Sequence, residues 1–139
     1  MIGANRQTDW PERLSELVIA SADKEFAWGA FDCSQFCIDA EIAITGDTRF
    51  WDFYRNYKTK RGAAWKLKQK RFENVWELVD SRLDALENVK LAQRGDVIGH
   101  FTDDGKSLGI LIGDRFACVG DPKGIVFKPL SEAVCAWRL

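Results

Sequence analysis

The sequence predicts an α+β protein in which helices come first and an antiparallel sheet follows. The 139 residues fit the usual size of one domain. Hydrophobic residues make up 46% and charged residues 29%, which is the balance of a globular protein with a buried core. Apolar residues recur at helical spacing up to about residue 90, and short apolar runs separated by turn residues follow. We therefore expect one domain over residues 1–139, helical over about 9–90 and sheet-forming over about 91–139.

The first predicted helix begins near Asp9 and ends at about Lys24. Thr8 or Asp9 can cap it, and Pro11 suits its first turn. An apolar stripe runs along it, made of Leu14, Leu17, Val18 and Ser21.

A second helix is predicted after a glycine-containing turn at residues 28–30. It begins near Asp32 and is closed by Gly46. Apolar residues at helical spacing indicate that it is central and mostly buried: Phe36, Cys37, Ala40, Ala43 and Ile44. Cys33 falls in its first turn.

Residues 47–90 have a charged, helical character. We expect helices over 47–57 and 62–86, outside the sheet. Their expected inward positions are Trp65, Phe72, Trp76, Val79 and Leu83.

Five short apolar runs then predict strands, over residues 96–101, 107–113, 115–120, 124–130 and 134–139. Turn residues at 103–105 and 113–114 favour an antiparallel meander of about five strands.

Composition limits the classes of function. A net charge of -1 gives no global basic field, so we expect no nucleic-acid partner. No apolar stretch suits a signal peptide or a spanning helix, so we expect a soluble cytosolic product without a membrane anchor. Six Trp and nine Phe are many for this length and favour an assembly partner.

The four cysteines show no paired spacing typical of structural zinc, so we expect free thiols, no metal and no cofactor. Cys33 alone has a suggestive position, because the positive end of a helix favours a thiolate. The competing interpretation is that Cys33 is a small buried residue retained for packing, since free cysteines are among the most buried residues.

Two motifs resemble NlpC-type papain-like cysteine peptidases. Residues 32–36, Asp-Cys-Ser-Gln-Phe, resemble the start of the helix that carries the nucleophile in that family, and residues 94–97 resemble the strand that follows the helical half. The resemblance implies a papain-like fold with Asp32 and Cys33 at family positions. It also implies that Ser107 stands where the family has its catalytic histidine, and that Ala117 lies in the stretch where the family has a third, orienting polar residue. A thiol without a base is a weak nucleophile at neutral pH.

The ordered set of short motifs more closely resembles a family of small tailed-phage proteins related to these peptidases, in which the histidine position is likewise not histidine. These motifs run from Trp28-Gly29 through residues 94–97 to the C-terminal Ala-Trp-Arg-Leu. The resemblance implies a degenerate, structural or assembly component of a phage tail tip, near the hub and the central fibre or spike protein. It would be present in the host cytoplasm during assembly and then in the virion tail.

The alternative is an active peptidase or amidase that cleaves peptidoglycan with Cys33 as the nucleophile. Its base would be His100, the only histidine, or a residue of another chain.

A basic run contains no acidic residue and is a possible interaction surface. We expect it to contact an acidic protein partner or to be a solvated helix face, and a nucleic-acid module is the less favoured alternative. Its members are Lys58, Lys60, Arg61, Trp65, Lys66, Lys68, Lys70 and Arg71.

Overall fold

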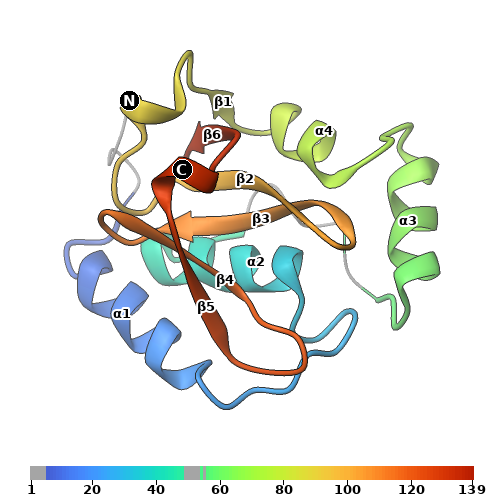
Figure 1. Cartoon of the computed structure of the whole chain (residues 1–139), viewed down its shortest axis with the longest axis horizontal. Helices are drawn as coiled ribbons and strands as arrows, with labels where there is room; N and C mark the ends of the chain where they lie inside the picture. Colours follow the sequence, from blue (N-terminus) through green and yellow to red (C-terminus); the bar gives the residue numbers. More distant parts are fainter. Residues whose placement is uncertain (1–5, 49–53, 55) are drawn as a thin grey trace.

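Helices precede an antiparallel sheet of six strands, as the sequence predicts at the level of fold class. The computed structural model describes residues 6–48, 54 and 56–139. The helices are α1 (Trp10–Ala20), α2 (Cys33–Thr45), α3 (Lys60–Gln69) and α4 (Val75–Asp80). The strands are β1 (Asp84–Ala85), β2 (Val97–Thr102), β3 (Gly105–Leu111), β4 (Arg115–Val119), β5 (Ile125–Pro129) and β6 (Cys135–Arg138). Figure 1 shows α1 and α3 at opposite sides of the molecule, with α2 behind the sheet.

The strand order is β1-β6-β2-β3-β4-β5, with every neighbouring pair antiparallel. Strands β2 to β5 form the predicted meander. The last strand departs from it, because β6 returns to pair with the free side of β2. A sixth strand, β1, pairs with β6 and lies within a segment that the sequence predicts to be helical.

The predicted helix over 62–86 is wrong, since two helices and a strand occupy it. Arg71 has a positive φ of 65°, and Asn74 starts α4 by accepting a hydrogen bond from the Glu77 N–H at 3.1 Å. Trp65, expected to point inward, is 59% exposed. The described residues of the expected 47–57 helix are not helical, and residues 49–53 and 55 of that segment lie outside the described part.

Helix α2 begins and ends as predicted, with Asp32 as its N-cap and Gly46, at a φ of 80°, as its C-cap. It packs against β3, where Leu108 and Ile110 face the shared core. The Cys37 sulfur lies 3.9 Å from the Gly109 carbonyl oxygen. This contact brings the start of α2 against β3.

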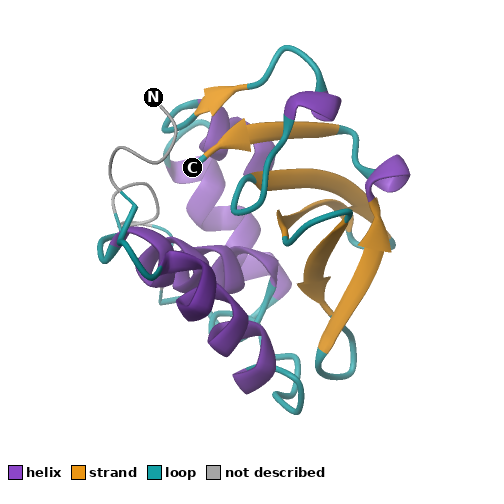
Figure 2. Ribbon diagram, turned by 90° about the vertical axis from the view of Figure 1, so that its left-hand side faces the viewer, coloured by secondary structure: helices purple, strands orange, loops and turns teal. Residues whose placement is uncertain are grey.

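The core lies mainly between the helices and one face of the sheet. It includes Phe36, Ile38 and Ile44 from α2, packed with Leu108 and Ile110 from β3. A smaller cluster lies on the other face, where the 3₁₀ helices Val89–Leu91 and Leu130–Glu132 contribute partly buried side chains. Figure 2 shows the α-helices on one side of the sheet and the short 3₁₀ helices on the other.

Candidate functional site

Asp32 fixes the start of α2 through three hydrogen bonds. Its carboxylate accepts from the N–H of Gln35 at 2.9 Å, the N–H of Gly29 at 2.8 Å and the hydroxyl of Tyr57 at 2.7 Å. The residue is 2% exposed. Because all three donors are used to hold the turn and the helix end, Asp32 is a structural cap of the segment that carries the thiol.

Cys33 is the first residue of α2 and is partly buried. Burial is the largest cause that raises the pKa of its thiol above the ordinary value of 9.0, and the charge of the adjacent Asp32 carboxylate is the second. Hydrogen bonding by the Ser107 side chain, the Leu108 backbone and the Ser34 side chain opposes this shift of the pKa without reversing it. The surroundings therefore favour the neutral thiol.

Ser107 and Ala117 lie on neighbouring strands, β3 and β4. The Ser107 side chain interacts with the Cys33 thiol, so the structure brings together these two sequence-predicted positions. Ala117 is fully buried and pairs with Ile110, and its methyl group offers no hydrogen bond to an adjacent side chain.

His100 lies on β2 directly opposite Ser107 in the strand register. Its imidazole is buried, with Nδ1 3.5 Å from Lys128 Nζ and its ring 4.9 Å from that of Phe116. Among the described residues, Nε2 has no hydrogen-bond partner. Burial and the Lys128 charge lower the pKa of His100. A catalytic role for it remains a prediction, and His100 does not line the cavity that contains Cys33.

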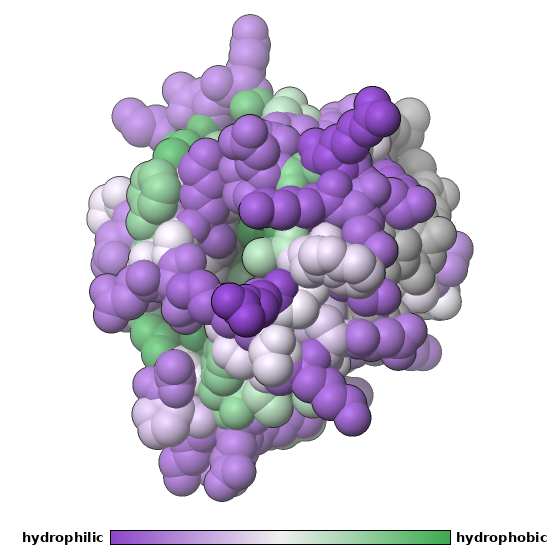
Figure 3. Space-filling view, turned by 90° about the vertical axis from the view of Figure 1, so that its right-hand side faces the viewer, coloured by the Kyte–Doolittle hydropathy of each residue, from purple (hydrophilic) through white to green (hydrophobic). Residues whose placement is uncertain are grey.

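A cavity of about 390 Å³ opens beside Cys33. Phe26 and Trp28, which precede α2, line it together with Tyr54 and Tyr57, which follow α2. Figure 3 shows the hollow on the face that bears α3, with apolar residues inside a polar rim. The cavity can receive a side chain or a peptide segment of a ligand.

Several cavity residues were not identified from the sequence. Burial raises the pKa of both Tyr54 and Tyr57, and Lys106 and Lys128 bring cations to the cavity from β3 and β5. Long-range folding alone brings these residues to Cys33. Tyr54 and Tyr57 lay within the helix predicted over 47–57, which gave no sign that they would approach Cys33.

The basic run lies on and around α3. Lys60 also lines the cavity and pairs with Asp104 at 3.0 Å, whereas Trp65 projects into solvent. Within the described part of the chain, there is no group of three or more residues suited to hold a metal ion. Nor is any described helix both long and apolar enough to cross a bilayer.

Comparison with curated proteins gives no match. Residues 5–139 match the model of a family described as a domain of unknown function, DUF6950. That match covers every helix and strand that the structure describes. The chain therefore belongs to the DUF6950 family.

Proposed function

We propose that this protein is a structural or assembly component of a bacteriophage tail tip, with a degenerate papain-like fold of the NlpC type. Its partners would be other tail proteins, such as the hub and the central fibre or spike protein. The protein would work in the host cytoplasm during assembly and remain in the virion tail.

The arrangement of α2 and β3 supports the papain-like part of this proposal. Cys33 lies at the start of a central helix that packs against an antiparallel sheet. Ser107, the residue at the expected histidine position, lies beside it on β3. The motif order of the tailed-phage proteins supports the tail-tip part.

One observation is the main support for the proposed loss of catalysis. The side chain that interacts with Cys33 from β3 is the hydroxyl of Ser107, which cannot accept a proton from a thiol at neutral pH. The thiol pKa is raised at the same time, so the neutral form dominates. A cavity beside a neutral thiol that lacks a base suits the binding of a ligand better than the cleavage of a bond.

Catalysis is tested by incubating the purified protein with peptidoglycan and measuring released fragments by mass spectrometry. We expect no release above that of Cys33→Ala. Strong release by the native chain that Cys33→Ala abolishes would contradict the loss of catalysis.

The tail-tip role has its own test. In a phage that encodes this chain, deletion of its gene should leave incomplete tails in electron micrographs, and a copy carrying Cys33→Ala should restore them. Normal yields of infectious particles from the deletion would refute the assembly role.

One observation favours the alternative, a peptidase or amidase active on peptidoglycan. His100 is the cross-strand partner of Ser107, and Ser107 interacts with Cys33, so the histidine lies on the strand next to the one that contacts the thiol. If the peptidoglycan assay gave release that His100→Ala and Cys33→Ala both abolished, this second function would replace the first.

A further inference from the structure

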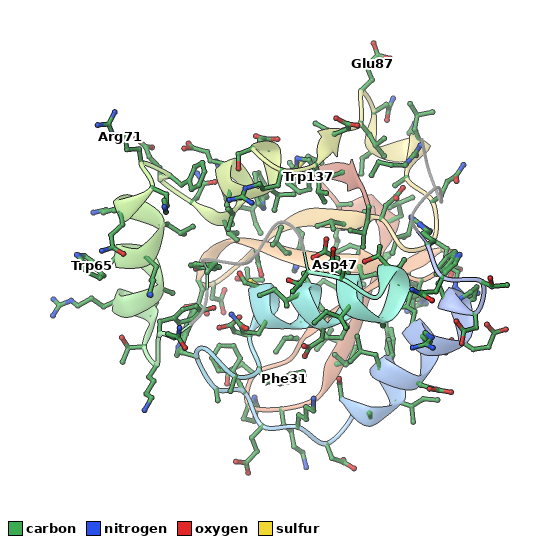
Figure 4. The ribbon with its side chains drawn as sticks, turned by 180° about the vertical axis from the view of Figure 1, so that it is seen from behind. Phe31, Asp47, Trp65, Arg71, Glu87 and Trp137 are labelled. Carbon is green, nitrogen blue, oxygen red and sulfur yellow. The ribbon has the colours of Figure 1, made fainter. Side chains whose placement is uncertain are left out.

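The outer face of α3 presents two cations and a large aromatic side chain in one stripe. Arg61, Trp65 and Lys68 are exposed at positions i, i+4 and i+7, which lie on one side of a helix. The opposite side anchors the helix through Ala63 and Leu67, which are buried. Figure 4 shows Trp65 pointing away from the body of the molecule.

The outer face of α1 presents a stripe of the opposite charge. Glu12, Glu16 and Ile19 are exposed at the same i, i+4 and i+7 spacing, while Leu14 is buried against the core. Ile19 is 75% exposed, the largest exposed fraction among the large hydrophobic residues described. Two charges and one apolar group thus form each stripe.

The charges of both stripes lack intramolecular ion pairs in the part of the chain that the structure describes. Lys60 and Arg13 have carboxylate partners, at 3.0 and 2.8 Å. Arg61 and Lys68 on α3 have none within 4.0 Å, and the same holds for Glu12 and Glu16 on α1. These four charges remain available to a partner.

Charge is divided unevenly along the chain. Residues 58–71 contain seven cations and no acid, a charge of +7, and the whole chain carries -1, so the remaining residues carry -8. A near-zero net charge gives two copies little mutual repulsion. The same acidic remainder would repel a nucleic acid that approached α3, so the observations favour a protein occupant.

From these observations we propose that copies of this chain associate head to tail, with the basic stripe of α3 in one copy docked on the acidic stripe of α1 in the next. The two helices lie at opposite sides of the molecule in Figures 1 and 4. A contact between different faces is heterologous, and it builds rings or open chains of subunits according to its rotation. This proposal does not depend on the tail-tip role.

The contact is weak and sensitive to salt. Two helix faces bury less than the roughly 1,000 Å² typical of a stable interface. Exposed charges are also screened beyond about 10 Å at 0.1 M salt. We therefore expect association at high protein concentration and low ionic strength, with Trp65 and Ile19 supplying the apolar contact.

The experiment measures the mass of the native chain by sedimentation at low and high salt, over a range of concentrations. Two charge-reversed variants accompany it, Arg61→Glu with Lys68→Glu on α3, and Glu12→Lys with Glu16→Lys on α1. We expect self-association of the native chain at low salt and its loss at high salt. Each reversed variant should associate at least about tenfold more weakly. Trp65→Ala should weaken association as well.

Mixing the two reversed variants makes the test specific. Native α3 in one variant faces native α1 in the other, and the reversed faces also have opposite charge, so mixed complexes should form where neither variant associates alone. Reversal of Lys90 and Lys123, exposed cations outside both stripes, is the matched control and should leave association unchanged. Melting temperatures establish that each variant folds.

A native chain that stays monomeric at low salt overturns the proposal, as do variants that associate like the native chain. A single-stranded DNA probe of about 30 nucleotides, long enough for several contacts, tests whether the stripe binds nucleic acid instead. Tight, salt-dependent binding of that DNA, lost in the α3 variant and accompanied by a monomeric chain, would assign the stripe to nucleic acid instead.

Discussion

The Cys33 thiol illustrates how neighbouring residues decide the chemistry of one position. A helix start favours the thiolate, but burial and the Asp32 carboxylate act in the opposite direction and raise the pKa. The sequence alone predicted that Cys33 lies in the first turn of the helix, and it left a reactive thiol and a buried packing residue as competing interpretations. The polar contacts of the thiol with Ser34 and Ser107 were not predicted, because β3 approaches α2 only in the folded chain.

Those polar neighbours change the expected effect of Cys33→Ser. From the sequence, a hydroxyl at this position would be buried in an apolar site and costly to leave unpaired. In the structure it has Ser34 and Ser107 nearby as partners, so the loss of stability should be small.

Native Cys33 should react slowly with iodoacetamide. Its raised folded-state pKa keeps the thiol neutral, so labelling in the native chain should lag behind that in the unfolded chain and accelerate as pH rises from about 7 to 10. The free energy of unfolding also depends on this pKa. The stabilising contribution of the neutral thiol is complete below the ordinary pKa of 9.0 and is lost as pH rises through the folded-state pKa. Mass spectrometry of labelled peptides measures both rates.

Asp32→Asn provides the control, because it keeps a capping oxygen and removes the carboxylate that raises the thiol pKa. Labelling of Cys33 in this variant should be faster than in the native chain. Native labelling that exceeds the rate of the unfolded chain would mean that the thiol is a prepared nucleophile.

At the scale of elements, local signals located both ends of α2. Asp32 and Gly46 bound α2 as predicted, because capping depends on neighbours in sequence. The break between α3 and α4 was missed, although Asn74 followed by Glu77 is a typical start signal for a helix. Strand β1 could not be predicted, since its two residues are ordered by pairing with the distant β6.

The close packing of β3 beside β4 depends on the absence of a side chain at Gly109. Gly109→Ala would place a Cβ 2.8 Å from the Ala117 carbonyl oxygen and 2.9 Å from the Phe116 ring, so the strands or the ring must move. We expect a loss of about 1–3 kcal/mol in the free energy of unfolding. Denaturant titration measures it.

Gly62→Ala is the matched control, because its Cβ would meet no backbone atom outside its own helix and would lie 3.2 Å from its nearest atom, the Thr59 hydroxyl oxygen, at a helical position. Its effect should be small or stabilising. Equal stability losses for the two variants would show that the packing of β3 beside β4 does not depend on Gly109.

At the scale of the whole molecule, one buried carboxylate connects distant parts of the chain. Asp96 is fully buried and binds Arg6 at 3.2 Å and Arg138 at 3.3 Å, which are 90 and 42 residues away in the sequence. The sequence alone predicted a strand that begins at residue 96. Gly95, just before it, has a φ of 94° in the turn that leads into the strand, but no local pattern predicts partners so far apart.

Replacing Asp96 should therefore destabilise the molecule as a whole. Asp96→Asn keeps the shape of the side chain but removes the charge that balances Arg6, whose side chain is 5% exposed, and Arg138. An uncompensated buried cation costs about 3–5 kcal/mol, which is a large share of the stability of a small domain. Asp104→Asn removes the partner of Lys60 in an exposed pair and should cost less than about 1 kcal/mol. Chemical denaturation at neutral pH measures both variants, monitored by tryptophan fluorescence. If the two losses are equal, the Asp96 cluster contributes no more than a surface ion pair, and its burial must be balanced by other contacts.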